Sequence, residues 1–481
     1  MRFLGALGLP WVGLFLLGWL STVAIAPKLS AAEPFEFDRI RGEEDWIADG
    51  DLATLATLPA YKAIQITERS WLTLGGEWRL AFELNGNEGW GEVPGTDAMA
   101  LERIMAHAAW TYLPQTGPFD RVRLFAQLKH GETHGRSAED RVPDVDLLDW
   151  NAAFLELRSR PFTRGSSADG QVTLRLGRQE LQYGAGRLIA TRAGATNTRI
   201  SFDAALLRYA SKAFEVDFFY ALPNETDPGA FDNGRLDGRK LRGFYATWRK
   251  NHSSLDFFSF LDERPQSYFQ GRGREKRYSV GGRWSYERGR LSQDFLFTWQ
   301  WGDFRAETGQ IGDIEAWTAS SQSHLRLRDG GWQETLNLFT GYATGDDDAA
   351  NPDVGTFRAP YPPGRYFGSG APNGPLNVVF YRLGLGLQPS SKLALDVGYY
   401  DFYRESTQDG TYGVPGIPLN PPGTSGERHV GRLVELVAAV PWGQRGDIEA
   451  EASYFFPGAF FDDQALEAEA TFFGLRMTYR F

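Results

Sequence analysis

The last residues of the chain alternate between two kinds of side chain with a strict period of two. The large apolar set consists of Phe473, Leu475, Met477, Tyr479 and Phe481. The residues between them are Gly474, Arg476, Thr478 and Arg480. A period of two places these sets on opposite faces of one strand. The pattern therefore predicts a strand that separates an apolar environment from an aqueous one.

Similar alternation recurs along the chain from Trp71 onward. About eighteen segments have the ~10-residue length that a tilted membrane strand needs. Lipid admits only helices and closed barrels, because every backbone polar group must be paired within it. After residue 32 no uninterrupted apolar run is long enough for a spanning helix. The sequence therefore predicts an all-β fold, a transmembrane antiparallel β-barrel of about 18 strands over residues 71–481. A closing strand with a free terminal Phe481 resembles the signal that the barrel-insertion machinery reads.

The expected connections alternate in length. If the strands are numbered from Trp71, the long connections follow odd strands, at about 131–148, 179–197, 221–239, 343–375 and 404–428. The connections after even strands are short, as at Asn251–His252. Long outer loops that alternate with short periplasmic turns are typical of outer-membrane barrels, and an even strand number leaves both termini in the periplasm. A soluble sandwich or propeller has no reason to alternate in this way.

The N-terminal residues 1–32 read as a secretory signal peptide. Arg2 precedes an apolar run from Phe3 to Leu20, and small residues follow. Cleavage fits after Ala26 or after Ala32, and we favour Ala32 because Pro27 would hinder the first site. The alternative is an uncleaved membrane anchor. Residues 33–70 are expected to be an N-terminal periplasmic segment or a plug, and the sequence leaves these two readings open.

Composition excludes several classes of function. The chain has no cysteine, which rules out thiol catalysis, zinc–thiolate sites and iron–sulfur clusters. Removal of residues 1–32 takes away two cations and lowers the net charge from −11 to −13, so we expect no nucleic-acid partner. His130 with His134, and Asp346–Asp348, are read as hydrated loops, although calcium at the acidic loop is left open. We predict no catalytic residue, metal or cofactor, and no enzyme.

The most basic stretch of the chain lies between Arg158 and Arg199. It holds eight arginines, no lysine and two acids, which gives a local charge of +6. Arginine suits carboxylates because its planar fork can bond both oxygens. Alternation places Arg175 inward beside outward Leu174, and it places Arg199 and Asp203 inward. The residues expected to line the pore are Arg123, Arg158, Arg175, Arg178, Arg187, Arg199 and Asp203. The alternative is that these arginines only pair with acids inside the barrel.

Two groups of residues carry a family resemblance. The first group comprises Gly177–Leu181, Tyr183-Gly184, Gly186–Ile189, Arg199 and Phe202-Asp203. The second comprises Thr344–Asp346, Gly355–Phe357, Tyr361-Pro362 and Tyr366-Phe367. Together they resemble the alginate export porin family over about residues 70–481. The resemblance implies an eighteen-stranded barrel with an arginine-lined path for an anionic polysaccharide, and it carries over Arg178, Arg187, Arg199 and Asp203 as site positions.

The function expected from these features is transport by a porin in the bacterial outer membrane. The solute would be an alginate-like anionic polysaccharide or oligosaccharide, or a related polar carbohydrate. Inward arginines would attract it weakly enough to release it. Two alternatives remain, a general porin for anions or small solutes and an outer-membrane enzyme with its site at the barrel mouth. The other expected partners are outer-membrane lipid, lipopolysaccharide and, through Phe481, the insertion machinery.

Overall fold

The structure, a computed structural model, describes most of the chain after the N-terminal region. The described residues are 37–47, 58–161, 170–194, 196–267, 273–328, 330–348, 350–414, 416–462, 464 and 468–481. The predicted signal peptide at 1–32 lies outside them. No described helix is long and apolar enough to cross a membrane.

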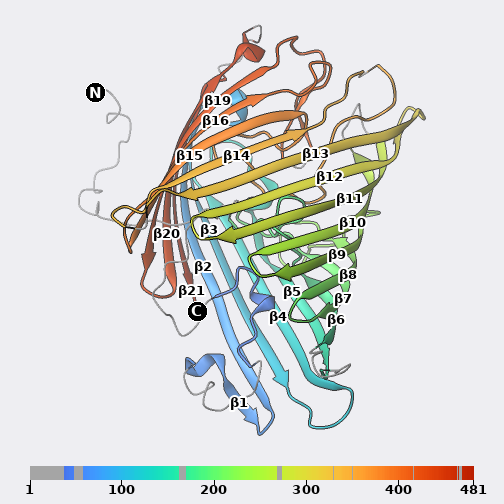
Figure 1. Cartoon of the computed structure of the whole chain (residues 1–481), viewed down its shortest axis with the longest axis vertical. Helices are drawn as coiled ribbons and strands as arrows, with labels where there is room; N and C mark the ends of the chain where they lie inside the picture. The colour runs from blue at the N-terminus through green and yellow to red at the C-terminus, as the bar shows by residue number, and fades with distance from the viewer. Residues whose placement is uncertain are drawn as a thin grey trace.

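Eighteen antiparallel strands of the described residues form a closed barrel, as the alternation predicted (Figure 1). The ring closes where β21 pairs with β2, from Glu77 opposite Arg480 to Gly86 opposite Thr471. The wall strands are β2 (Ser70–Asn87), β3 (Val93–Tyr112), β4 (Phe119–His134), β5 (Asp146–Ser159), β6 (Gln171–Gln179), β7 (Phe202–Ala210), β8 (Phe214–Pro223), β9 (Lys240–Lys250), β10 (Ser253–Ser267), β11 (Gly273–Arg288), β12 (Leu291–Ala306), β13 (Ile311–Arg326), β14 (Thr335–Ala343), β15 (Val378–Ser390), β16 (Leu393–Tyr403), β19 (His429–Trp442), β20 (Gly446–Pro457) and β21 (Ala470–Arg480).

A few short strands and helical turns lie outside the eighteen wall strands. Strand β1 (Ile64–Thr67) extends the start of β2, and β17 (Thr411–Tyr412) pairs with β18 (Pro418–Asn420) inside one long loop. The short helical turns are η1 (Arg41–Glu43), η2 (Ala60–Lys62), α2 (Glu88–Gly91), η3 (Val142–Asp144) and η4 (Ala459–Phe461).

The connections follow the predicted alternation with few exceptions. Long loops at one rim link β4 to β5, β6 to β7, β8 to β9, β14 to β15 and β16 to β19. At the other rim, two-residue turns close several hairpins, where Asn251 (φ 53°) and Gly289 (φ 61°) adopt the left-handed conformation that such tight turns require. The longer connections at this rim, at 160–170 and 327–334, were not anticipated.

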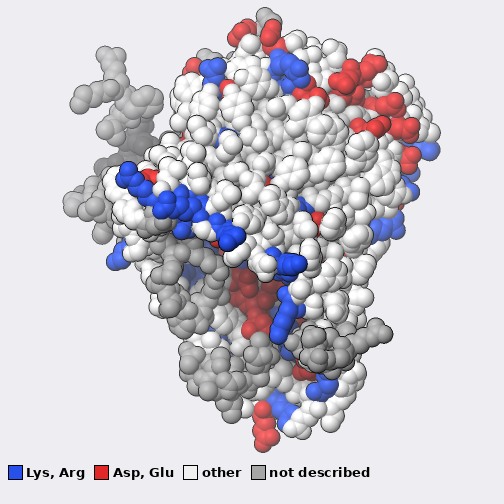
Figure 2. Space-filling view, viewed as in Figure 1, with Lys and Arg blue, Asp and Glu red and all other residues white. Residues whose placement is uncertain are grey.

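The outer face of the barrel is apolar. Exposed leucines, valines and aromatic residues recur at every second position, among them Leu124, Leu207, Leu383 and Leu475. Figure 2 shows a broad surface with few charged residues over the middle of the wall, and charged residues gather toward its edges. This is the surface that a lipid environment selects, because one face of each strand meets hydrocarbon.

The main apolar core lies inside the barrel, beneath the outer rim. It joins inward residues of the wall to residues of two long loops, residues 180–201 (loop A) and residues 344–377 (loop B). Phe202 of β7 packs edge-on against Tyr361 of loop B, with ring centroids 5.1 Å apart. Phe367 of loop B likewise contacts Phe380 of β15, at 4.5 Å. The loops therefore fold back into the barrel and fill part of its interior.

Candidate functional site

The inner face of one side of the barrel, from β2 to β7, carries a set of arginines. We call this set the arginine wall. Their outward neighbours Leu80, Leu124, Leu176 and Leu207 are 40–49% exposed, which fixes the opposite face as the interior. The members are Arg79 on β2, Arg103 on β3, Arg121 and Arg123 on β4, Arg175 on β6 and Arg208 on β7.

Loop A is held against the upper part of this wall. Arg79 donates hydrogen bonds to three loop carbonyl oxygens, including that of Thr196 at 2.8 Å, and to Asn197 Oδ1 at 3.2 Å. Arg103 reaches the carbonyl oxygen of Ala193 at 3.0 Å while it pairs with Glu77. Two buried guanidinium groups therefore satisfy loop carbonyls that would otherwise lack partners inside the barrel.

The same loop also reaches the opposite wall. Arg187 donates to Ser320 Oγ at 2.9 Å and to Gln322 Oε1 at 2.8 Å, both on β13, and lies 3.2 Å from Asp294 on β12. Arg199, near the end of the loop, pairs with Glu180 at 2.6 Å. Loop A therefore crosses the barrel interior.

Loop B narrows the remaining space. Arg358 donates to Asp262 on β10 at 2.8 Å, and Arg365 pairs with Glu83 on β2. An isolated bridge joins Ile189 of loop A to Tyr361 of loop B in parallel orientation. The two loops thus form one layer across the interior, and a solute must pass beside or between them.

The described N-terminal residues 37–47, called the N-terminal segment from here on, lie against the lower part of the arginine wall. Glu43 lies 2.5 Å from Arg175 and 3.1 Å from Arg208. Asp45 pairs with Arg121. Arg123 donates to the carbonyl oxygen of Gly42 at 2.7 Å. Figure 1 shows this segment beside the C-terminus of the chain.

The surroundings of Glu43 favour the ionised form of its carboxylate. Burial by itself would raise its pKa. The charges of Arg175 and Arg208, and the hydrogen bonds that they donate, outweigh burial and hold the pKa of Glu43 below its usual value of 4.5. The position between these two arginines is therefore a strong site for an ionised carboxylate.

The structure places five of the seven predicted site residues inside the barrel. Arg123 and Arg175 belong to the arginine wall, and Arg187 and Arg199 lie on loop A. Arg158, on β5, lies 2.8 Å from Asp120 and 3.7 Å from Asp45. Arg158 therefore adjoins the lower end of the wall.

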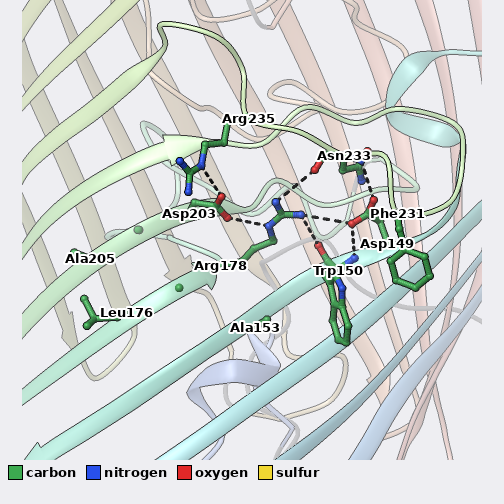
Figure 3. A pocket seen from close by; sticks show the side chains of 12 residues that line it. Asp149, Trp150, Ala153, Leu176, Arg178, Asp203, Ala205, Phe231, Asn233 and Arg235 are labelled. Atoms are coloured by element: carbon green, nitrogen blue, oxygen red, sulfur yellow. Dashed lines mark hydrogen bonds and ion pairs between the residues drawn. The ribbon is translucent and has the colours of Figure 1, made fainter.

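Arg178 and Asp203 lie on the outer side of the barrel instead. Arg178 Nε lies 2.9 Å from Asp203 Oδ1, and Arg178 also approaches Asp149 at 3.5 Å (Figure 3). They line an open pocket of about 690 Å³ together with outward Leu176 and Ala205. Asp203 was expected to point inward. Phe202 takes the inner face because loop B covers it with an aromatic ring, so an apolar residue is stable there.

Sequence reasoning missed most of the arginine wall and both of its acidic partners in the N-terminal segment. Arg79, Arg103, Arg121 and Arg208 all lie outside the basic stretch from Arg158 to Arg199. Each of these arginines has an apolar residue on at least one side in the strand, so strand periodicity carried a usable signal for them. No local pattern could pair Arg175 with a glutamate 132 residues earlier in the chain.

Comparisons with solved structures support the fold. The chain is similar to OccAB4 of Acinetobacter baumannii, with 9% identity, a TM-score of 0.56, and coverage of 85% of this chain and 98% of that one. It is similar to OprD of Pseudomonas aeruginosa, with 14% identity, a TM-score of 0.53, and coverage of 88% and 97%. OccK2 of Pseudomonas aeruginosa, solved in complex with glucuronate, shares 11% identity over 85% and 97%, with a TM-score of 0.53.

The family of this chain follows from a match in sequence rather than from the structural comparisons. No curated protein matches the chain. Residues 70–474, which include the whole barrel except the last residues of β21, match the family described as alginate export. Together with a closed barrel and porin-like neighbours, this match indicates a transport protein of the bacterial outer membrane. The chain belongs to the alginate export family.

Proposed function

We propose that this porin passes an anionic, uronate-bearing saccharide along the arginine wall. The observation that carries the proposal is that Arg175 and Arg208, on neighbouring strands, converge on a single carboxylate, that of Glu43. A uronate presents the same chemical group. Guanidinium groups bind carboxylates through charge-assisted hydrogen bonds, and their planar fork adds geometric selectivity.

The wall has a surplus of positive charge along the proposed path. Four arginines, Arg121, Arg123, Arg175 and Arg208, lie beside only two wall acids. Arg121 and Arg175 bond Glu156, Arg208 bonds Asp217, and Arg123 acts on Glu156 through its charge alone. Charge within a narrow, low-dielectric passage acts more strongly than the same charge on an open surface. Successive arginines also give a solute several weak sites rather than one tight site, which conduction requires.

Two further observations support a sugar acid as the solute. The family is named for alginate export, and the structural neighbour OccK2 has been solved with glucuronate. We propose further that the apolar outer face contacts outer-membrane lipid and lipopolysaccharide, and that the insertion machinery recognises Phe481.

The test uses single-channel recording in planar bilayers. Oligogalacturonate should interrupt the current of the native protein, and a maltooligosaccharide of equal length should interrupt it far less. Arg123→Ala should reduce both this block and the preference for anions. Arg235→Ala removes the same charge from the outer side, where its side chain is 61% exposed, and should leave both unchanged.

Salt dependence tests the electrostatic origin of the effect, and the choice of solute separates the proposal from a general porin. The effect of Arg123→Ala should shrink as salt rises, because the screening length falls from about 10 Å at 0.1 M to about 3 Å at 1 M. A general anion porin would show the same salt dependence but no difference between oligogalacturonate and small anions. Equal block by the charged and the neutral oligosaccharide would overturn the proposal.

A further inference from the structure

We propose that the N-terminal segment is a built-in competitor for the carboxylate site, held by the arginine wall until a uronate displaces it. This inference rests on the proposed function, because it identifies what occupies the solute site when the solute is absent. The segment would then act as an internal gate that its own substrate opens.

The first support is chemical identity. The group that the segment presents to Arg175 and Arg208 is a carboxylate, with oxygens 2.5 Å and 3.1 Å from the two guanidinium groups. Each arginine keeps a wall acid as well, since Arg175 lies 2.6 Å from Glu156 and Arg208 lies 2.7 Å from Asp217. Departure of Glu43 therefore leaves a preformed site rather than two unpaired cations.

The second support is charge balance. The four arginines of the lower wall exceed the two wall acids beside them, Glu156 and Asp217, by two positive charges. The segment brings two negative charges into contact with that wall, Glu43 and Asp45. A stretch of oligouronate carries one carboxylate on each sugar, so it can replace both charges together.

The third support is the manner of attachment. The wall and loop A both hold the segment, since Arg123 of the wall donates to the carbonyl oxygen of Gly42 at 2.7 Å and Arg199 of loop A donates to that of Arg39 at 2.5 Å. The segment's amides of Glu43 and Glu44 bond to its own carbonyls at Ile40 and Arg41. Contacts of this kind can be exchanged one at a time for contacts with a hydroxyl-rich solute.

The segment also sits where it can obstruct passage. It contacts β4, β6 and β7 through their inward arginines and reaches loop A at Arg199. Gly42 lies against the wall so closely that an added Cβ would come within 3.1 Å of the Phe154 ring. A solute that follows the arginine wall must therefore move the segment aside.

The first experiment compares Glu43→Gln with Glu68→Gln, an exposed glutamate in the turn before β2. Glu43→Gln keeps the side-chain shape but removes the charge. The ratio of docked to displaced segment should fall roughly ten-fold, because hydrogen bonds to a charged group contribute more than neutral ones. Channel conductance should rise, and oligogalacturonate should block at lower concentration. Glu68→Gln should resemble the native protein.

The second experiment watches the segment directly. The chain has no native cysteine, so Ile40→Cys gives a unique position for a spin label. The label should be immobile in the resting channel, and oligogalacturonate should mobilise it, whereas a maltooligosaccharide of equal length should not. In the Glu43→Gln background it should be mobile without any solute.

The outcomes separate this inference from the proposed function. If oligogalacturonate blocks current but Glu43→Gln behaves like Glu68→Gln, the gate is refuted and the uronate pathway stands. If Glu43→Gln raises conductance and frees the label but oligogalacturonate does nothing, the segment is a plug and the uronate pathway is refuted. If the label stays immobile while oligogalacturonate blocks the channel current, displacement of the N-terminal segment is refuted.

Discussion

Arg79 Nη2 donates a hydrogen bond of 2.8 Å to the carbonyl oxygen of Thr196, so the strand at the barrel seam holds a loop 117 residues further along the chain. Arg79 is 3% exposed, and its neighbouring nitrogen bonds two more carbonyls of loop A. Arg79 thus contributes three of the hydrogen bonds that hold the loop carbonyls in the interior, beside those of Arg103.

Replacement of Arg79 by alanine should loosen loop A. Several buried carbonyls would lose their donors, at a cost of about 1–3 kcal/mol for each group left unsatisfied. We expect higher conductance and more open-channel noise in bilayer recordings. Arg242→Ala removes a half-exposed arginine that pairs with Glu263 on the next strand and should change neither property. Identical traces for the two variants would show that Arg79 does not position the loop.

Substitution of Leu383 by arginine should destabilise the barrel in a way that depends on depth. Leu383 is 53% exposed at the middle of β15, opposite Leu338 and Tyr399 on the flanking strands. An arginine near the midplane of the bilayer costs on the order of 2–4 kcal/mol. The temperature at which the folded band is lost on gels should therefore fall. Leu327→Arg, at an exposed leucine beyond the end of β13, should be nearly neutral.

Docking of the N-terminal segment should persist in mild acid. A carboxyl whose pKa is lowered on docking contributes stability that is present above its free pKa and is lost as the pH falls through the docked pKa. The pKa of Glu43 is held below 4.5, because Arg175 and Arg208 outweigh burial. Resting conductance should therefore be unchanged between pH 7 and pH 4.5. A rise in conductance centred near pH 4.5 would mean that Glu43 is not held by the arginines.

Changes at Phe481 should affect assembly more than conduction. Its ring lies over Gly76, where an added Cβ would meet the ring at 2.5 Å, and its backbone pairs with the same residue. Phe481→Ala should lower the amount of folded protein in the outer membrane, whereas Phe481→Tyr should retain it. Phe473→Ala removes a comparable ring from the outer face of the same strand and should have a smaller effect. Normal levels of Phe481→Ala in membrane fractions would argue against recognition of this residue.

The fold could be predicted because contact with lipid on one face gives each strand a clear alternation of apolar and polar residues. The residues from Phe473 to Phe481 alternate cleanly, since one face meets hydrocarbon and the other meets a polar interior. The same rule fails on β7, where loop B packs on the inner face. There Phe202, Ala204 and Leu206 are buried inside, so an apolar residue no longer identifies the lipid side.

The site was only partly predictable for a related reason. Arg175 was placed in the interior by its outward neighbour Leu174, and Arg123 was also expected to line the pore. The structure brings both to the arginine wall. Glu43 and Asp45 lie in residues 33–70, for which the sequence left a periplasmic segment and a plug both open. Their pairing with the wall depends on how the chain returns to its own beginning, and no sequence spacing encodes that contact.

The N-terminal segment also contacts the end of the chain. Arg41 donates to the carbonyl oxygen of Phe481 at 3.0 Å, and Lys62, which follows the segment in the chain, donates to the same oxygen at 3.3 Å. That oxygen reaches its place only when β21 has paired with β2. This contact of the segment therefore forms only after the wall has become continuous. The contact between Arg41 and Phe481 thus couples the position of the proposed gate to completed closure of the barrel.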